Sequence, residues 1–171
     1  MNVVTVTTVP SRYRRSVATI VVSAAALLAA CSSSTPAMPS ASASKADIAH
    51  AYQTLFNMQD KAVGTKLAVI QNGSTLKNAI TAALASPMAG EAAGATVNSV
   101  SILSDSGCKA EYLPSPCAAV GYSILLPSVS TGNLTGLKGF AVYENGRWVV
   151  SRSTICSLLT LENNNNAPQG C

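Results

Sequence analysis

The segment Lys138–Arg152, KGFAVYENGRWVVSR, decides the architecture of this chain. It contains two runs of β-forming residues, and the dipeptide Asn145-Gly146 between them is the strongest short hairpin signal. We therefore predict an antiparallel pair of strands at Lys138–Glu144 and Arg147–Arg152. Ser153 comes directly afterwards and is expected to cap a last helix.

Two further strands are predicted upstream of this hairpin. Ala118–Leu126 alternates between apolar and other side chains, which is the pattern of a strand with one buried face. Ala95–Leu103 is also β-forming, but its apolar positions change parity between Val97 and Val100, which predicts a β-bulge. The sheet should thus have about four antiparallel strands, whereas a lipocalin-like barrel would need about eight.

The residues before these strands have helical periodicity. Ser44-x-x-Asp47 has the spacing of a capping box and precedes one apolar stripe, formed by Ile48, Tyr52, Leu55 and Phe56. Asp60 and Ser74 are expected to begin two shorter helices. Helices followed by a strand meander predict an α+β domain over residues 46–162. In it, the helices would pack on the concave face of a curved antiparallel sheet.

The first thirty residues have the pattern of an export signal. Arg14 and Arg15 precede the apolar run Val17–Ala30, which is too short to span a bilayer as a helix. The run ends in Leu28-Ala29-Ala30-Cys31, which resembles the bacterial lipoprotein box. In such proteins the chain is cut before the cysteine, whose sulfur carries a diacylglycerol with palmitate-like acyl chains. An ordinary signal peptide with a chance cysteine at its end is the alternative.

The residues after Cys31 are rich in serine, proline and alanine. Such a composition cannot bury enough apolar surface to fold, so residues 31–45 are expected to form the lipidated cysteine and a flexible tether. With a signal peptide at 1–30, this predicts a domain held on the extracytoplasmic face of the cell membrane through its lipid anchor.

The hairpin and the residues after it resemble a known family. Gly139–Arg152 ends in a Trp-x-x-Ser-Arg pattern, and Leu158-Leu159 follows in the last predicted helix. In these features, and in Lys61–Leu84, the chain resembles the C-terminal domain of the mycobacterial low-molecular-weight secreted antigens, named for a twelve-kilodalton founding member. The resemblance covers roughly residues 46–162. It implies export, a cone-shaped fold like that of nuclear transport factor 2, and no established enzymatic activity. Two features depart from the family. The lipobox implies an anchored rather than a released protein, and four added cysteines imply more local cross-linking than the family requires.

Four cysteines remain once Cys31 is assigned to lipid: Cys108, Cys117, Cys156 and Cys171. An exported chain of this size with an even set is expected to carry two disulfides, in one of three connectivities. We favour Cys108–Cys117, which closes the Gly/Pro-rich loop between two strands, and Cys156–Cys171, which ties the asparagine-rich tail at 163–171 to the last helix. A zinc or redox site is the alternative, but no pair has C-x-x-C spacing.

Charge and composition argue against several functions. The chain beyond Cys31 holds eight Lys/Arg and all seven acids, a formal charge of +1, so no nucleic acid partner is expected. The acids fall at predicted helix starts, turns, loops and the tail, and His50 is the only imidazole. No catalytic residue, cofactor or metal is therefore expected, and the chain is not expected to be an enzyme. Arg152 is expected only to cap the strand–helix junction.

Two functions fit these observations. The first is a non-catalytic, surface-exposed lipoprotein and antigen domain that presents an interaction surface to an envelope partner, either a protein or a lipid. The alternative is a carrier or sensor that holds a hydrophobic ligand in its cone, lined by Tyr52, Phe56, Tyr122 and Trp148. The simpler interpretation is that these four residues are ordinary core, because a domain of this size with so few aromatic residues needs them there. An open cavity beside them would favour the carrier, and a filled cone with an apolar patch on the outer sheet face would favour the interaction domain.

Overall fold

The computed structural model describes residues 38–128 and 132–171. The expected signal peptide, Cys31 and the first residues of the expected tether lie outside these ranges. Their assignment stays a prediction.

Four antiparallel strands form one sheet in the order β1-β2-β3-β4: Gly94–Ile102, Cys117–Leu125, Leu134–Glu144 and Arg147–Val150. The predicted hairpin is present, with Tyr143 opposite Trp148 in the register of β3 and β4. Asn145 and Gly146 both adopt positive φ, 51° and 78°, as the tight turn requires. The predicted bulge in β1 is confirmed as well, because the register with β2 shifts between Val97 and Ser99.

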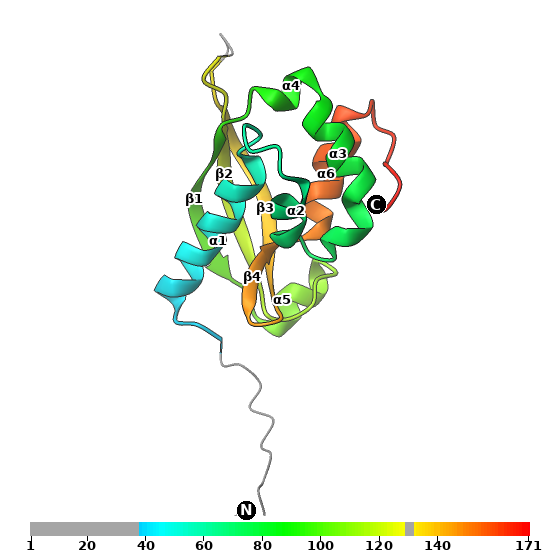
Figure 1. Ribbon diagram of the computed structural model, residues 1–171. Coiled ribbons are helices and arrows are strands. Elements are labelled where there is room, and N and C mark those ends of the chain that lie inside the picture. Colours follow the sequence, from blue (N-terminus) through cyan, green and yellow to red (C-terminus); the bar gives the residue numbers. More distant parts are fainter. Residues whose placement is uncertain (1–37, 129–131) are drawn as a thin grey trace, which may run out of the picture. The chain divides into compact units, whose positions relative to one another are not determined.

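Six helices and one 3-10 turn accompany the sheet in the described residues: α1 Ala41–Phe56, α2 Val63–Ala68, η1 Gly73–Leu76, α3 Lys77–Ala85, α4 Pro87–Gly90, α5 Asp105–Ala110 and α6 Arg152–Glu162. Helix α1 packs against β1 and β4, the two edges of the sheet. One helix can touch both edges because the sheet curls around it into a half-barrel (Figure 1). The predicted α+β class and cone-like shape are confirmed, while the likeness to nuclear transport factor 2 stays a prediction.

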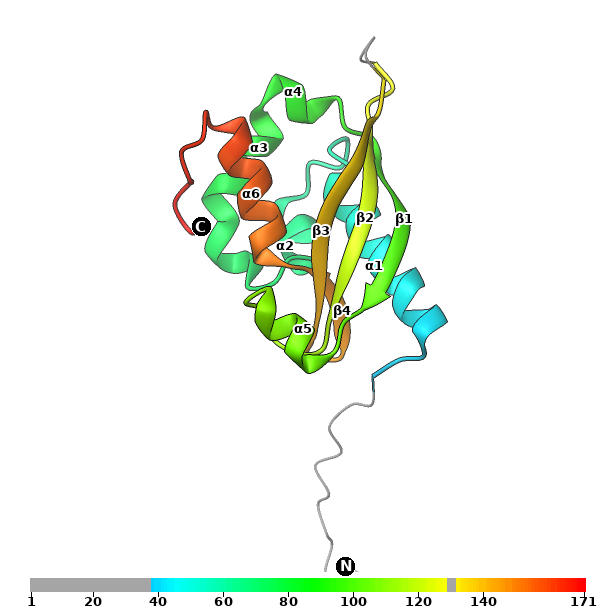
Figure 2. The ribbon, with the colours of Figure 1, turned by 180° about the vertical axis from the view of Figure 1, so that it is seen from behind.

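The core lies on the concave face of the sheet, the face toward α1. Apolar side chains of α1, α3 and α6 meet Val120, Tyr122 and Ile124, the alternating residues of β2. A second, smaller cluster lies on the opposite face and joins Cys108 and Leu113 to Val142 and Val149. Helix α5 covers this cluster at one end of the sheet, as the reverse view shows (Figure 2). Both faces of the hairpin β3–β4 are therefore buried.

All four predicted helix starts differ in the structure. Helix α2 begins at Val63 rather than at Asp60, and α3 begins at Lys77, after the 3-10 turn, rather than at Ser74. Helix α1 begins at Ala41, where the side chain of Ser40 accepts a hydrogen bond from the Ala43 amide. Residues 41–45 thus belong to the helix and not to the tether, and the predicted cap, Ser44, is buried with its hydroxyl 3.3 Å from the Pro39 carbonyl oxygen that it donates to. The alanines of this segment favour the helix. Helix α6 is capped by Ser151 instead of Ser153, which shortens β4 to four residues.

The loops also hold more order than their sequences predict. Helix α5 lies inside the expected Gly/Pro-rich loop, capped by the Ser104 hydroxyl, which accepts from the Gly107 amide. Strand β3 begins at Leu134, four residues before the predicted start. Ile70, expected on a helix, instead forms a parallel bridge with Val150 and covers the outer edge of β4.

Candidate functional site

Three of the four aromatic residues expected to line a ligand pocket pack directly on one another. The ring centroid of Tyr122 lies 4.8 Å from that of Tyr52 and 5.5 Å from that of Phe56, and all three side chains are buried. Trp148 packs instead on Tyr143, with centroids 5.4 Å apart. The rings fill the cone where the carrier hypothesis places its ligand. A pocket at these residues stays a prediction that this packing does not favour.

The two buried tyrosines are held in their neutral forms. Burial raises the pKa of Tyr122 to about 12. Burial, together with the neighbouring Tyr122, raises the pKa of Tyr52 further still. The Tyr52 hydroxyl donates a 3.1 Å hydrogen bond to the Phe140 carbonyl oxygen of β3. The Tyr52 hydroxyl therefore attaches α1 to β3.

Lys66 is a buried charged residue that sequence reasoning missed. Its side chain has no solvent exposure, and its Nζ donates to the carbonyl oxygens of Thr54 and Asn57, 2.7 and 2.6 Å away. Asp60 lies 3.7 Å from the same Nζ. Burial lowers the pKa of the ammonium group, whereas Asp60 raises it. The lysine thus closes the C-terminal end of α1, where helix carbonyls lack partners.

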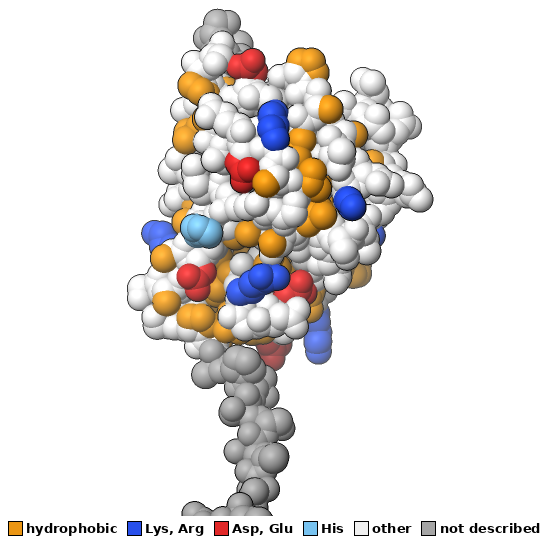
Figure 3. Space-filling view, in the orientation of Figure 1, with side chains coloured by type: hydrophobic (Ala, Val, Ile, Leu, Met, Phe, Trp, Pro, Cys, Tyr) orange, Lys and Arg blue, Asp and Glu red, His pale blue; other side chains and the backbone are white. Residues whose placement is uncertain are grey.

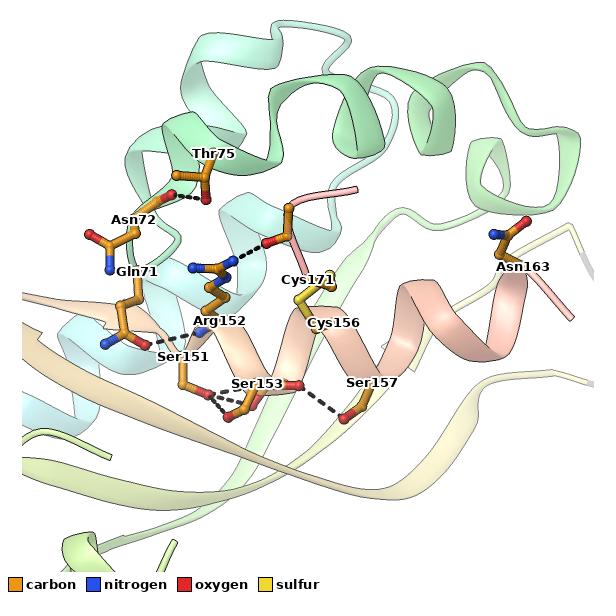
Figure 4. Close-up of a disulfide and its surroundings, with 12 residues drawn as sticks. Gln71, Asn72, Thr75, Ser151, Arg152, Ser153, Cys156, Ser157, Asn163 and Cys171 are labelled. Atoms are coloured by element: carbon orange, nitrogen blue, oxygen red, sulfur yellow. Dashed lines mark hydrogen bonds between the residues drawn. A yellow bond between two sulfur atoms is a disulfide. The ribbon is translucent and has the colours of Figure 1, made fainter. Parts of the chain in front are cut away.

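Both expected disulfides are present. Cys108 of α5 is bonded to Cys117, the first residue of β2, and both are completely buried. Cys156 of α6 is bonded to Cys171, so the asparagine-rich tail is tied to the last helix as predicted (Figure 4). No set of three or more His, Cys, Asp or Glu residues within 38–128 and 132–171 is arranged to hold a metal ion.

The structure has an apolar cleft between α3 and α6, which lie side by side in both ribbon views (Figures 1 and 2). Its volume is about 330 Å³. Small side chains of α3 form one wall, and Leu159, Glu162 and the tail residue Pro168 lie opposite. This cleft lies away from the four expected aromatic residues, none of which lines it.

A second cleft, of about 460 Å³, lies beside the Cys156–Cys171 disulfide. We call it the polar cleft, and its lining residues come from three separate loops and α6: Gln71, Asn72, Tyr112, Leu113, Arg152, Ser153, Cys156 and Cys171. Figure 4 shows how its polar groups are fixed. The Arg152 amide donates to Gln71 Oε1 at 3.2 Å, and the guanidinium donates to the Gly170 carbonyl oxygen. Arg152 thus joins three chain segments, in addition to standing at the predicted strand–helix junction.

Charged side chains are sparse on the surface. Figure 3 shows them as isolated spots of both signs. None of the seven acids is buried, and His50 is exposed on α1. No helix among the described residues has the length and apolar character needed to cross a bilayer.

These features define a disulfide-stapled α+β domain with a filled half-barrel and two surface clefts. The model of the family described as low molecular weight antigen MTB12, C-terminal domain, matches residues 41–166. The chain therefore belongs to this antigen family, as the Trp-x-x-Ser-Arg hairpin indicated. No curated protein and no solved structure matches the chain.

Proposed function

We propose that this protein is a non-catalytic antigen domain, anchored by lipid on Cys31 at the outer face of the cell membrane, which presents an interaction surface to the envelope. The observation that carries the proposal is the combination of Leu28-Ala29-Ala30-Cys31 with two disulfides in the domain that follows. Disulfides persist in oxidising compartments, and an antigen family favours the same extracellular or envelope location.

The distance between the anchor and the domain is short. Because α1 begins at Ala41, only residues 32–40 separate it from Cys31. Fully extended, this segment reaches roughly 30 Å. The domain would therefore sit close to the membrane surface, and its partners would be molecules of the adjacent envelope layer.

The titratable groups support a non-catalytic role. The described groups with clearly shifted pKa values are Tyr52, Lys66 and Tyr122. Each is buried and makes contacts that explain its position in the core or at a helix end. General acid–base chemistry instead needs a shifted group that a substrate can reach.

The test compares the full chain with Cys31→Ser, both expressed in a lipoprotein-processing bacterial host. We expect the wild type to enter the detergent phase of a temperature-induced phase separation, and its mass to show loss of residues 1–30 with a diacylglyceryl addition. The Cys31→Ser chain should lack the added mass, while a Ser32→Ala control should keep it. Wild-type protein that retains Met1 without added mass would refute the anchor.

The apolar cleft between α3 and α6 supports a carrier of a small hydrophobic ligand as the second candidate. Its volume of about 330 Å³ lies near the lower end of the range for small-molecule sites. Native mass spectrometry of gently extracted protein would detect such a ligand as mass released on denaturation. Replacing Ala83 with leucine should then reduce this bound mass, because the larger side chain enters the cleft.

A further inference from the structure

We propose that the polar cleft is a binding site for an uncharged saccharide of the cell envelope, with Tyr112 as its stacking platform. The inference deepens the proposed interaction role by naming its partner class, and it rests on that role for the source of the saccharide. Three features support this inference: the exposure of Tyr112, the chemistry of the cleft walls, and the two disulfides that tie the loops of the cleft to the rest of the domain.

Tyr112 is held away from the rest of the protein. Its side chain is 96% exposed, in a domain whose other aromatic residues are buried or half-buried. Its backbone has a φ of 55°, the left-handed conformation in which the chain leaves helix α5, and a bulky residue is uncommon there. On either side, the chain is fixed by hydrogen bonds, from the Tyr112 amide to the Lys109 carbonyl and from the Leu113 amide to the Cys108 carbonyl.

The loop therefore holds the backbone of Tyr112 in place and leaves the ring exposed to solvent. Leu113, the next residue, is buried in the smaller apolar cluster, and the Cys108–Cys117 disulfide closes the loop. A tyrosine offers an apolar ring face and a polar hydroxyl at low entropic cost, because its side chain has only two main torsions. The C–H face of a sugar ring is the natural counterpart of such a surface.

The walls of the cleft match the hydroxyl groups of a sugar. Gln71 and Asn72 carry planar amides, Arg152 a guanidinium and Ser153 a hydroxyl, so donors and acceptors lie side by side. Arg152 is the single charged side chain among the lining residues, and its guanidinium already donates to the Gly170 carbonyl. Recognition of a charged ligand would need further cations or anions here, so the chemistry favours an uncharged, hydroxyl-rich molecule.

Size and shape distinguish a saccharide from a protein partner. The volume of about 460 Å³ lies within the range of sites for compact ligands, and a disaccharide is a ligand of that size. A protein interface would instead need an apolar centre, whereas Leu113 and the half-cystines are the apolar residues here. The Cys156–Cys171 disulfide forms one wall, so the site exists before the ligand binds.

The experiment is saturation-transfer NMR on the full chain, purified in a detergent without a sugar headgroup. The probes are N,N′-diacetylchitobiose, maltose and an α-linked arabinobiose. We expect saturation transfer to at least one probe, with affinity at least about 10-fold weaker in Tyr112→Ala and within about 3-fold of wild type in Tyr112→Phe. Asn72→Gly keeps the positive φ of 51° while removing the amide, and should weaken binding about 5-fold.

Leu161→Ala is the matched control, because Leu161 is an exposed apolar residue of α6 outside the cleft. Circular dichroism, together with a protein mass that shows both disulfides formed, will show that each variant is folded. Absence of transfer to all three probes overturns the proposal, and so does transfer that Tyr112→Ala leaves unchanged. A protein cross-linked through position 112, without saccharide transfer, overturns it in favour of a protein partner.

The same measurement on Cys31→Ser separates this inference from the proposed anchor. Saccharide binding by that variant, in the absence of the lipid, would leave the site in place and remove only the anchor. A lipidated wild type that binds no saccharide would leave the anchor in place and overturn only the saccharide site.

Discussion

Replacing Lys66 with methionine is expected to lower the free energy of unfolding by about 1–3 kcal/mol. The substitution leaves the Thr54 carbonyl oxygen without its donor and removes one of two donors to the Asn57 carbonyl oxygen, which also accepts from the Asp60 amide. The carbonyl oxygens of Thr54 and Asn57 lie in the last turn of α1 and directly after it. They accept from the Lys66 ammonium at 2.7 and 2.6 Å. Methionine has a similar length and would fill the space without donating.

The magnitude follows from three contributions. The Thr54 carbonyl, left unpaired, costs about 1–3 kcal/mol, and the lost second hydrogen bond to the Asn57 carbonyl adds about 0.5–1.5 kcal/mol. The ion pair with Asp60, at 3.7 Å and with the carboxylate side chain 40% exposed, adds at most about 1 kcal/mol. In the opposite direction, burial lowers the pKa of Lys66, so the charged side chain carries a desolvation cost that methionine removes. The net loss is therefore smaller than the sum of the two hydrogen bonds and the ion pair.

Urea denaturation with the disulfides intact measures this loss through the linear dependence of the unfolding free energy on denaturant. Lys77→Met is the control, because Lys77 is exposed at the start of α3 and should change stability by less than about 0.5 kcal/mol. If Lys66→Met unfolds at the same urea concentration as the control, the role assigned to Lys66 at the end of α1 is wrong.

Three further predictions test the packing. Serine at both Cys156 and Cys171 should lower the free energy of unfolding by about 3 kcal/mol, because the cross-link joins residues 15 apart; an unchanged thermal midpoint would contradict this. Gly139→Ala should lower the free energy of unfolding by about 2 kcal/mol, since the new Cβ would lie 2.6 Å from Thr154 Cγ2 in α6. Calorimetry should show a lower melting temperature, and an unchanged one would mean that α6 moves aside without cost. Burial raises the pKa of Tyr122 from 10.0 to about 12, so its contribution to stability is complete below about pH 10 and is lost as pH rises through about 12. Unfolding free energies measured in this range should fall less steeply for Tyr122→Phe.

The hairpin and the bulge could be predicted because their signals are local. The turn needs positive φ at two successive positions, which Asn145 and Gly146 adopt easily. The bulge follows from the spacing of the apolar residues, which changes parity between Val97 and Val100. Helix α5 could not be predicted in the same way, since six residues are too few to show a helical period. The first residues of β3, from Leu134, are strand because β2 pairs with them.

The candidate sites show the same contrast between local signals, which could be predicted, and contacts between distant segments, which could not. The two disulfides follow from cysteine number and spacing, and the aromatic stripe on α1 correctly marked buried residues. Lys66 and Tyr112 reverse the usual preferences of their types, because the lysine is buried and the tyrosine is exposed. A sequence pattern identifies neither exception, since each depends on which distant segments meet. A tyrosine isolated between two cysteines is the one signal that could have drawn attention to the loop.

If the proposed lipid anchor holds this protein on a membrane, the bulge in β1 matters for the way its copies coexist there. Strand β1 is the outer strand of the sheet, whereas the other edge, β4, is covered by the bridge from Ile70 to Val150. Anchored molecules are confined to two dimensions, where neighbours meet often and an open, regular edge would invite sheet extension from one copy to the next. At the bulge, the Asn98 side chain donates to the Ser123 hydroxyl of its own sheet, at 2.9 Å. This irregularity makes the edge a poor template, so a crowded layer of these domains would remain a layer of separate molecules.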